Sequence, residues 1–279
     1  MPRFFIGPRS LFSIHGTDAV RYLNGQITQD VRRLLQEPHR GLPTCVTDAK
    51  GKLQAYATIY LINAEQPVIW LEASMELRES LFARLSRYLI ADDAEIDDIS
   101  DDFFLTHTIG EQTEGSAFAH SRFGVAGFDQ WLPSTIDISA QFFSPLEQAE
   151  KLRIQHGIPS WGHELVEGIL PPEAGLEAYA ISYHKGCYIG QEVISRIKSA
   201  GKTNRRLQRF TLASASNISL PASIFITGQS HEKAEGTITS VAFPDALGFL
   251  HKSAFQEKEF DLQLADGSNL TNAVSCIVD

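Results

Sequence analysis

The sequence is poor in cysteine, with three in 279 residues, namely Cys45, Cys187 and Cys276. An odd number of widely spaced cysteines does not describe a disulfide framework, and none of them stands in a Cys-x-x-Cys metal motif. This usage indicates a reducing compartment.

Long apolar runs are missing as well. No segment approaches the roughly 18 consecutive apolar residues that a membrane-spanning helix needs. The apolar patch within residues 1–9 is too short, and too interrupted by proline and arginine, to form the core of a signal peptide. We therefore expect a cytoplasmic protein with no membrane partner.

Positive charge is in deficit. The chain has 24 Lys and Arg against 34 Asp and Glu, a formal net charge of −10. A broad basic surface, whose counterion release drives most nucleic-acid binding, is therefore not available. We expect no direct nucleic-acid binding.

The remaining composition is that of an ordinary globular protein, with 43% hydrophobic and 21% charged residues. Over the first 200 residues, helical and strand patterns alternate without a βαβ rhythm, which favours an α+β fold. Residues 11–14 have the pattern of a strand, and the helix that follows has Thr17 or Asp18 as its N-cap.

Two further helices and one hairpin are predicted in this region. Residues 75–90 place leucines at helical spacing, and residues 144–155 begin with Ser144 as N-cap and a proline at the first helical position. Residues 45–61 read as strand, tight turn and strand, with residues 48–52 as the turn.

The texture of the sequence changes beyond about Lys202. Short alternating runs such as residues 260–264 are broken by turn dipeptides such as Asp266-Gly267. We predict a C-terminal all-β domain of about six strands, closed as a barrel, over residues 203–279. Residues 1–200 would then form the other part of the protein.

The densest cluster of special residues is the segment 181–194, ISYHKGCYIGQEVI. It reads as a strand feeding a tight loop that opens a helix near Gly190. The N-terminus of a helix and the charge of Lys185 would both favour the thiolate of Cys187, which would then be a nucleophile or a soft-metal ligand. The alternative is that Cys187 is a small buried hydrophobic residue.

Two other interpretations of this cluster are weak. His184 stands close to Cys187, but no Asp or Asn that would orient it is indicated, so a Cys/His hydrolase has little support. The histidines show no zinc-ligand spacing beside a second cysteine, and we predict no metal site of the chain's own.

A local reversal of charge follows this segment. No Asp or Glu occurs between Val193 and His231, and the basic residues there are Arg196, Lys198, Lys202, Arg205, Arg206 and Arg209. This basic stretch could hold an anionic ligand tail or a phosphate backbone. It could equally be a solvated face at a domain junction.

The segment 185–192, KGCYIGQE, resembles the signature of the YgfZ family of folate-binding proteins, which are related to the glycine-cleavage T-protein. The segments 22–31 (YLNGQITQDV) and 48–52 (DAKGK) resemble the two N-terminal motifs of that family. The segment 170–176 (LPPEAGL) resembles the one that precedes its cysteine loop.

This resemblance implies a ring of three subdomains of the T-protein type around a central hole that accepts tetrahydrofolate or a one-carbon derivative. It also implies a role in the assembly or repair of iron–sulfur proteins, including enzymes that modify tRNA. Folate, iron–sulfur enzymes and their assembly proteins would be the partners.

The resemblance further implies site residues. Cys187, with Lys185 beside it, would be the functional thiol. The residues that would bind the folate are Asn24, Gln26, Gln155, Tyr188, Gly190, Gln191, Glu192 and Arg196.

The sequence departs from the T-protein at two places. A catalytic Asp pair of that enzyme has no counterpart in residues 51–56, GKLQAY, so aminomethyl transfer is not expected. Gln155 stands where the T-protein has a Glu that contacts the pterin, and an amide cannot provide an ionised acceptor.

We therefore predict a folate-binding accessory factor for iron–sulfur proteins. The alternative is a folate-dependent one-carbon transferase or demethylase that uses another acid–base group. A third interpretation, an RNA-associated protein acting through residues 196–209, has the least support.

Overall fold

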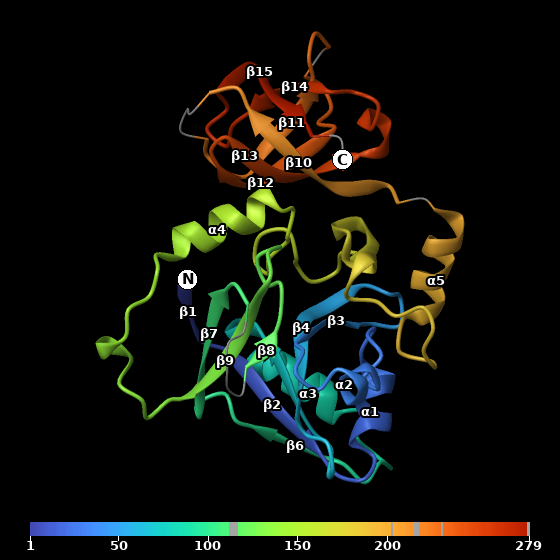
Figure 1. Cartoon of the computed structure of the whole chain (residues 1–279). Coiled ribbons are helices and arrows are strands. Elements are labelled where there is room, and N and C mark those ends of the chain that lie inside the picture. The colour runs from blue at the N-terminus through green and yellow to red at the C-terminus, as the bar shows by residue number, and fades with distance from the viewer. Residues whose placement is uncertain (112–116, 202, 215–217, 230, 278–279) are drawn as a thin grey trace.

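The computed structural model describes residues 1–111, 117–201, 203–214, 218–229 and 231–277. Lys202, a member of the basic stretch and the predicted start of the new texture, lies outside the described residues. The described chain forms three β-sheets, one of which is a closed barrel. The barrel lies at one end of the molecule and the two open sheets at the other, with helix α4 (Leu146–Gln155) between them (Figure 1).

The first open sheet has five strands in the order β3-β4-β5-β2-β6, all antiparallel to their neighbours. Their bounds are β2 (Ser10–His15), β3 (Leu42–Thr47), β4 (Leu53–Asn63), β5 (Val68–Ala73) and β6 (Glu95–Asp98). The turn between β3 and β4 has the predicted position, because the amide of Asp48 bonds the carbonyl oxygen of Lys52, at 2.9 Å. Gly51 in this turn has a φ of 71°, which favours glycine.

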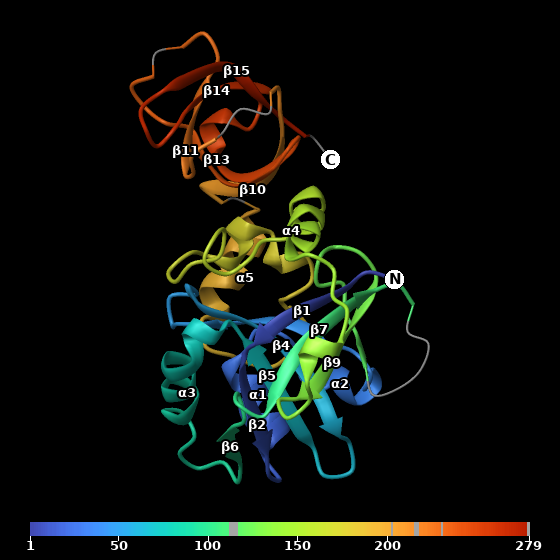
Figure 2. The same cartoon turned by 90° about the vertical axis from the view of Figure 1, so that its left-hand side faces the viewer.

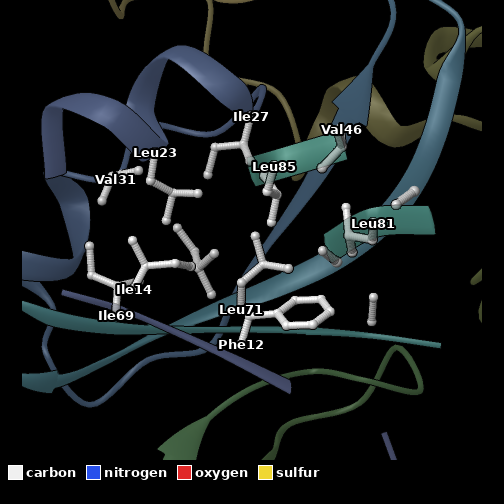
Figure 3. Close-up of a cluster of buried hydrophobic side chains, with 14 of the residues drawn as sticks. Phe12, Ile14, Leu23, Ile27, Val31, Val46, Ile69, Leu71, Leu81 and Leu85 are labelled. Carbon is white, nitrogen blue, oxygen red and sulfur yellow. The ribbon is translucent and has the colours of Figure 1, made fainter. Parts of the chain in front are cut away.

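Three helices accompany this sheet: α1 (Ala19–Gln26), α2 (Arg33–Gln36) and α3 (Arg78–Ser86), the last preceded by a 3-10 turn, Met75–Leu77. In α3 and this turn, Leu77, Leu81 and Leu85 recur every four residues and are buried on one face. Figure 3 shows Leu81 and Leu85 with Leu23 of α1, packed over Ile69 and Leu71 of the sheet. Each such side chain contributes about 1.5–3 kcal/mol by leaving water.

The second open sheet has four antiparallel strands in the order β1-β7-β9-β8. Their bounds are β1 (Arg3–Pro8), β7 (Phe103–Ile109), β8 (Phe118–Ala119) and β9 (Gly127–Pro133). Because β1 belongs to this sheet and β2 to the first, the chain crosses between the two sheets at Arg9. The two sheets therefore meet at the start of the chain.

A long connection with little regular structure joins the second sheet to the barrel. It contains the 3-10 turns Ile138–Ala140, Pro171–Ala174 and Leu176–Ala178 and the helices α4 and α5 (Gln191–Ala200). Helix α4 starts one residue later than predicted. Pro145 has a ψ of 136° and is itself the N-cap, and the amide of Ser144 bonds the carbonyl oxygen of Arg3, at 2.7 Å.

The C-terminal barrel closes six strands in the order β10-β13-β12-β11-β14-β15. Their bounds are β10 (Arg205–Leu212), β11 (Ala222–Ile226), β12 (Gly236–Ala242), β13 (Asp245–His251), β14 (Glu259–Gln263) and β15 (Asn269–Cys276), with a 3-10 turn at Lys252–Ala254. Closure pairs both edges of every strand. Figure 2 shows the barrel above α4 and α5, which separate it from the open sheets.

The predicted fold class, α+β with a C-terminal β-barrel, is confirmed. The division of the chain into domains at residues 1–200 and 203–279 stays a prediction. In the described residues, no helix is long and apolar enough to cross a membrane.

Candidate functional site

Three of the sequence motifs meet in space. The hydroxyl of Thr28 in the segment 22–31 donates to the carbonyl oxygen of Ala180, at 2.7 Å, and the amide of Ser182 donates to the carbonyl oxygen of Thr28, at 2.9 Å. The hydroxyl of Thr47, at the end of β3, donates to the carbonyl oxygen of Ile189, at 2.6 Å. The segment that carries Cys187 is therefore bonded to the motif 22–31 and to Thr47, the residue just before the motif 48–52, both more than 100 positions away in the sequence.

Lys185 attaches this loop to the segment 24–29 by hydrogen bonds. Its side chain is buried, and its Nζ donates to the carbonyl oxygens of Asn24, at 2.6 Å, and of Ile27 and Gln29, at 2.7 Å each. The carbonyl of Asn24 belongs to the last turn of α1 and those of Ile27 and Gln29 follow it, a region where backbone acceptors lack helical partners. Burial lowers the pKa of Lys185 to about 7. In the protonated form, its three N–H donors match the three carbonyl oxygens.

Lys185 thus positions the loop. Within the described residues, it makes no hydrogen bond to Cys187, and its charge is directed at the 24–29 segment. The role predicted for Lys185 beside the thiol stays a prediction.

Gly190 lets the loop approach the β3–β4 turn. It is the N-cap of α5 and has a φ of 89°. A Cβ at this position would lie 2.5 Å from the carbonyl oxygen of Asp48 and 2.9 Å from the Cα of Gly51. Glycine is required here both by its backbone conformation and by the space available.

Cys187 is exposed at the tip of the fastened loop. The alternative of a buried hydrophobic residue therefore does not describe it, although it does describe Cys45, which is fully buried in β3. Tyr188 next to it is buried, with its ring centre 5.2 Å from the Nζ of Lys185. An exposed thiol on a fixed loop can be reached by another protein or by a small reagent.

The other predicted residues near this loop are partly engaged in internal contacts. The side-chain oxygen of Asn24 accepts from the amide of Val31, at 3.0 Å, and that of Gln26 accepts from Arg84, at 2.9 Å. Glu192 and Arg196 pair with each other on the exposed side of α5, at 2.5 Å. Gln191 begins α5 and is half-buried.

Gln155 and the basic stretch lie at the junction with the barrel. The carbonyl oxygen of Gln155 accepts from Arg209, at 2.9 Å. Arg205 pairs with Glu173, at 3.0 Å, and stacks on the ring of Phe249. These contacts favour the interpretation of the stretch as a face at a junction.

A large cavity lies elsewhere, between the two open sheets. It has a volume of about 900 Å³ and is lined by residues of β1, α2, β3, β4, β5 and α4 and of the segments 40–43, 119–127, 158–161 and 178–179. Its ring-bearing side chains include Tyr56, Phe123, Trp161 and Tyr179. Volume and lining are typical of a site for a small molecule with a flat ring.

None of the predicted site residues lines this cavity in the described part of the chain. The cavity and the Cys187 loop are nevertheless joined through Gln29. Its carbonyl oxygen accepts from Lys185, and its side-chain amide donates to the carbonyl oxygen of Tyr179 in the cavity wall, at 2.9 Å. The molecule therefore has two candidate sites connected by one short segment.

The lining of the cavity is rich in arginine, although the chain has an excess of acidic residues. Five arginines line it against a single carboxylate, Glu72, and the arginines are Arg9, Arg33, Arg40, Arg122 and Arg153. Arg153 is paired with Glu150 and Glu164 behind the lining. Arg33 and Arg40 share one partner outside the lining, Glu37, at 3.3 and 2.5 Å. Anions are the ligands that such a wall attracts.

A buried polar network supports one wall. The guanidinium of Arg122 donates to Glu72, at 3.1 Å, and to Asp129, at 2.9 Å. Asp129 also accepts from Tyr60, at 2.8 Å, and contacts ring nitrogens of His107 and His120, at 2.8 and 2.6 Å. Arg122 and the two histidines hold the pKa of Asp129 well below its usual range.

Sequence reasoning missed this network. Its signal was a lone carboxylate in a strand that is otherwise apolar, as with Glu72 in VIWLEA and Asp129 in GFDQWLP. A buried charge in such a strand needs a partner. The partner, Arg122, lies in the other sheet region for Glu72, and no local pattern indicates that pairing.

Among residues 1–111, 117–201, 203–214, 218–229 and 231–277, no group of three or more His, Cys, Asp or Glu side chains is arranged to hold an ion.

The architecture and the cavity define the class of fold, which is that of the glycine-cleavage T-protein. The crystal structure of the glycine cleavage system aminomethyltransferase T from Bartonella henselae matches with a TM-score of 0.81, covering 99% of this chain and 85% of that one. The two sequences are 15% identical, so this likeness concerns the fold alone.

The particular resemblance is to YgfZ. The tRNA-modifying protein YgfZ of Aliivibrio fischeri is 28% identical over 280 residues, which cover 91% of this chain and 86% of the relative. An uncharacterized protein of Haemophilus influenzae is 27% identical over 242 residues, 86% of this chain and 84% of the relative. No family model matches the sequence. The resemblance to the YgfZ family inferred from the motifs is confirmed.

Proposed function

We propose that this protein binds a reduced folate in the arginine-lined cavity and acts, through Cys187, as an accessory factor in the assembly or repair of iron–sulfur proteins, including enzymes that modify tRNA. The observation that carries the proposal is the cavity, where five arginines face one carboxylate in a chain of net charge −10. The names of the YgfZ relatives and the T-protein fold support it.

The chemistry of a folate fits this cavity. A folate joins a flat pterin to an acidic glutamate tail. The rings of Tyr56, Trp161 and Tyr179 offer flat apolar surfaces for the pterin. Arg33 and Arg40 are half-exposed and have one carboxylate between them, so together they keep about one positive charge for the tail.

The arginines of the cavity replace the stretch 196–209 as the candidates for binding the tail. Arg205 and Arg209 are engaged at the barrel junction, and Arg196 pairs with Glu192. Arg33 and Arg40 line the cavity itself.

The thiol of Cys187 would contact the client protein or its cluster. It is exposed, while the loop around it is bonded to the core through Lys185 and Ile189. A fixed backbone with an exposed side chain suits repeated contact with partners, because binding then costs little conformational entropy of the loop.

The residues that line the cavity give little support to catalytic aminomethyl transfer of the T-protein kind. Residues 51–56 contain no carboxylate, and Tyr56 of that stretch lines the cavity. Arg9 and Arg122 hold the pKa of Glu72 below its usual range, so this carboxylate is a poor proton acceptor. The alternative of a one-carbon transferase or demethylase would need another group.

Folate binding is tested by calorimetric titration with tetrahydrofolate. The variant Arg33→Gln/Arg40→Gln should bind roughly tenfold or more weakly, since two charged hydrogen-bond donors are lost. Arg32→Gln is the matched control, because Arg32 is a neighbour that pairs with Asp30, at 2.8 Å, and does not line the cavity. Equal affinities for all three proteins, or no binding by the wild type, would contradict the proposal.

The role of the thiol is tested in cells that lack the protein. Cys187→Ala should fail to restore the activity of an iron–sulfur tRNA-modifying enzyme, although the purified variant still binds tetrahydrofolate. Cys276→Ala should restore it fully. Full support by Cys187→Ala would reject this part of the proposal.

The enzyme alternative is tested with methyl- or methylene-tetrahydrofolate and candidate acceptors. We expect at most one folate converted per protein molecule. Many turnovers would favour the transferase.

A further inference from the structure

We propose that His120 is a binding residue of the cavity, whose Nε2 accepts a hydrogen bond from a ring N–H of the reduced pterin. This inference rests on the proposed function and adds to it the group that recognises the heterocycle. It starts from the contacts of Asp129.

Asp129 fixes which nitrogens of two histidines carry protons. Its carboxylate contacts Nδ1 of His107, at 2.8 Å, and Nδ1 of His120, at 2.6 Å. The carboxylate is ionised and accepts only, so both Nδ1 atoms must donate. In a neutral imidazole the other nitrogen, Nε2, then carries a lone pair.

The two Nε2 atoms have different surroundings. That of His107 is sealed in the interior and has no hydrogen-bond partner within the described residues. That of His120 belongs to a side chain that is 8% exposed and lines the cavity. The hydrogen bonds of the described residues give this Nε2 no partner either. A nearly buried acceptor on a residue that lines a cavity can take its donor from a bound ligand.

The other charged groups of the wall cannot take this role. Arginines only donate. Glu72 has one oxygen bonded to Arg9, at 2.6 Å, and the other to Arg122, at 3.1 Å. Among the ionised and imidazole side chains that line the cavity in the described chain, His120 is therefore the acceptor that is left.

The residues packed around His120 come from several elements and form one hydrogen-bonded network with it. Asp129 comes from β9, His107 from β7 and Tyr60 from β4, while Arg122 stands two residues further along the same segment. Asp129 keeps its bonds to Arg122, Tyr60 and His107 if the ring of His120 is replaced. Substitution of His120 should therefore preserve the other hydrogen bonds of Asp129.

The class of ligand follows from this arrangement. Nε2 requires a donor, and the arginines require an anion. A reduced pterin with a glutamate tail has both, since its rings carry several N–H groups and its tail carries carboxylates. An acidic aromatic compound without an N–H would satisfy the arginines alone.

The test combines nitrogen NMR with variants. In the wild-type protein labelled with ¹⁵N at histidine, two imidazoles should carry a proton on Nδ1, and the Nε2 resonance of one of them should move when tetrahydrofolate is added. His120→Phe should remove that signal and weaken binding roughly tenfold, the value expected for a lost hydrogen bond that leaves a donor unpaired. His120→Gln, which can place an amide oxygen near the same point, should recover part of the affinity.

His39→Phe is the control, because His39 is an exposed histidine that does not line the cavity. Its affinity should equal that of the wild type. If tetrahydrofolate binds while the Nε2 resonance is unmoved, or if His120→Phe binds as tightly as the wild type, this inference is wrong and the proposed function stands. If tetrahydrofolate does not bind the wild type at all, the proposed function fails and the inference fails with it.

Discussion

The Nζ of Lys185 lies 2.6 Å from the backbone carbonyl oxygen of Asn24, although 161 positions separate the two residues. Lys185 stands two residues before the exposed Cys187, and Asn24 belongs to α1. This bond and those to Ile27 and Gln29 attach the cysteine loop to the first sheet region. The position of the thiol therefore depends on a buried lysine.

Replacing this lysine should loosen the loop. We expect Lys185→Met to lower the free energy of unfolding by roughly 2 to 4 kcal/mol, because three buried carbonyl oxygens lose their donor. The stability of Lys185→Arg should lie between those of the wild type and of Lys185→Met, since a planar guanidinium cannot point at three converging oxygens. Urea unfolding measures the loss, and hydrogen exchange of residues 183–190 reports the loop.

Lys198→Met is the control for this experiment, because Lys198 is exposed on α5 and lies over the ring of Tyr183. It should change stability by less than about 0.5 kcal/mol. A similar loss of unfolding free energy in Lys185→Met and Lys198→Met would show that the three hydrogen bonds of Lys185 contribute no more to stability than the contacts of an exposed lysine.

Gly190 should tolerate no side chain. Gly190→Ala places a Cβ 2.5 Å from the carbonyl oxygen of Asp48, so the loop and the β3–β4 turn must separate. We expect a loss of more than about 3 kcal/mol, against about 1 kcal/mol for Gly201→Ala, which has a positive φ but open space. Thermal unfolding of the two variants compares them, and equal losses would mean that the close approach costs nothing.

The three cysteines should react in a fixed order with a thiol reagent. Cys187 is exposed and should react first. Burial raises the pKa of the half-buried Cys276, and it raises that of the fully buried Cys45 to about 12, so Cys276 should react slowly and Cys45 only on unfolding. In Cys187→Ala the fast phase should disappear. A fast phase that persists in this variant would refute the assignment.

Acid should destabilise the protein through the network around Arg122. Asp129 and Glu72 have pKa values below the 3.8 and 4.5 that are usual for such groups. On acidification the unfolded chain therefore takes up protons first, and stability present at neutral pH is lost progressively below about pH 5. Asp129→Asn should show a smaller loss between pH 7 and pH 4 than the wild type in urea unfolding. Parallel curves for the two proteins would argue against the network as the source.

Local features of the fold could be predicted from the sequence because the residues that decide them are neighbours. The turn at 48–52, the loop that opens a helix near Gly190 and the six-stranded barrel all follow from turn residues and alternation. The strand predicted to lead into that loop was wrong, because residues 179–190 form no strand and Ser182 bonds instead to the carbonyl oxygen of Thr28. The start of α4 was misplaced because Pro145 keeps an extended ψ and Ser144 is bonded to Arg3 in another strand.

The cavity could not be predicted in the same way. Its wall joins Glu72 and Arg122, which are 50 positions apart. Its other arginines come from the link between β1 and β2, from α2 and the residues after it, and from α4. Each of these arginines reads as an ordinary surface residue in its own stretch of sequence. Only the packing of the two open sheets brings them to one cavity.

The most direct measurement is a crystal structure of the protein with bound tetrahydrofolate. We predict the pterin between the two open sheets, within hydrogen-bonding distance of His120, and the tail carboxylates against Arg33 and Arg40. A folate found instead on the basic stretch 196–209, or crystals in which a saturating concentration leaves the space beside Trp161 without ligand, would contradict the account.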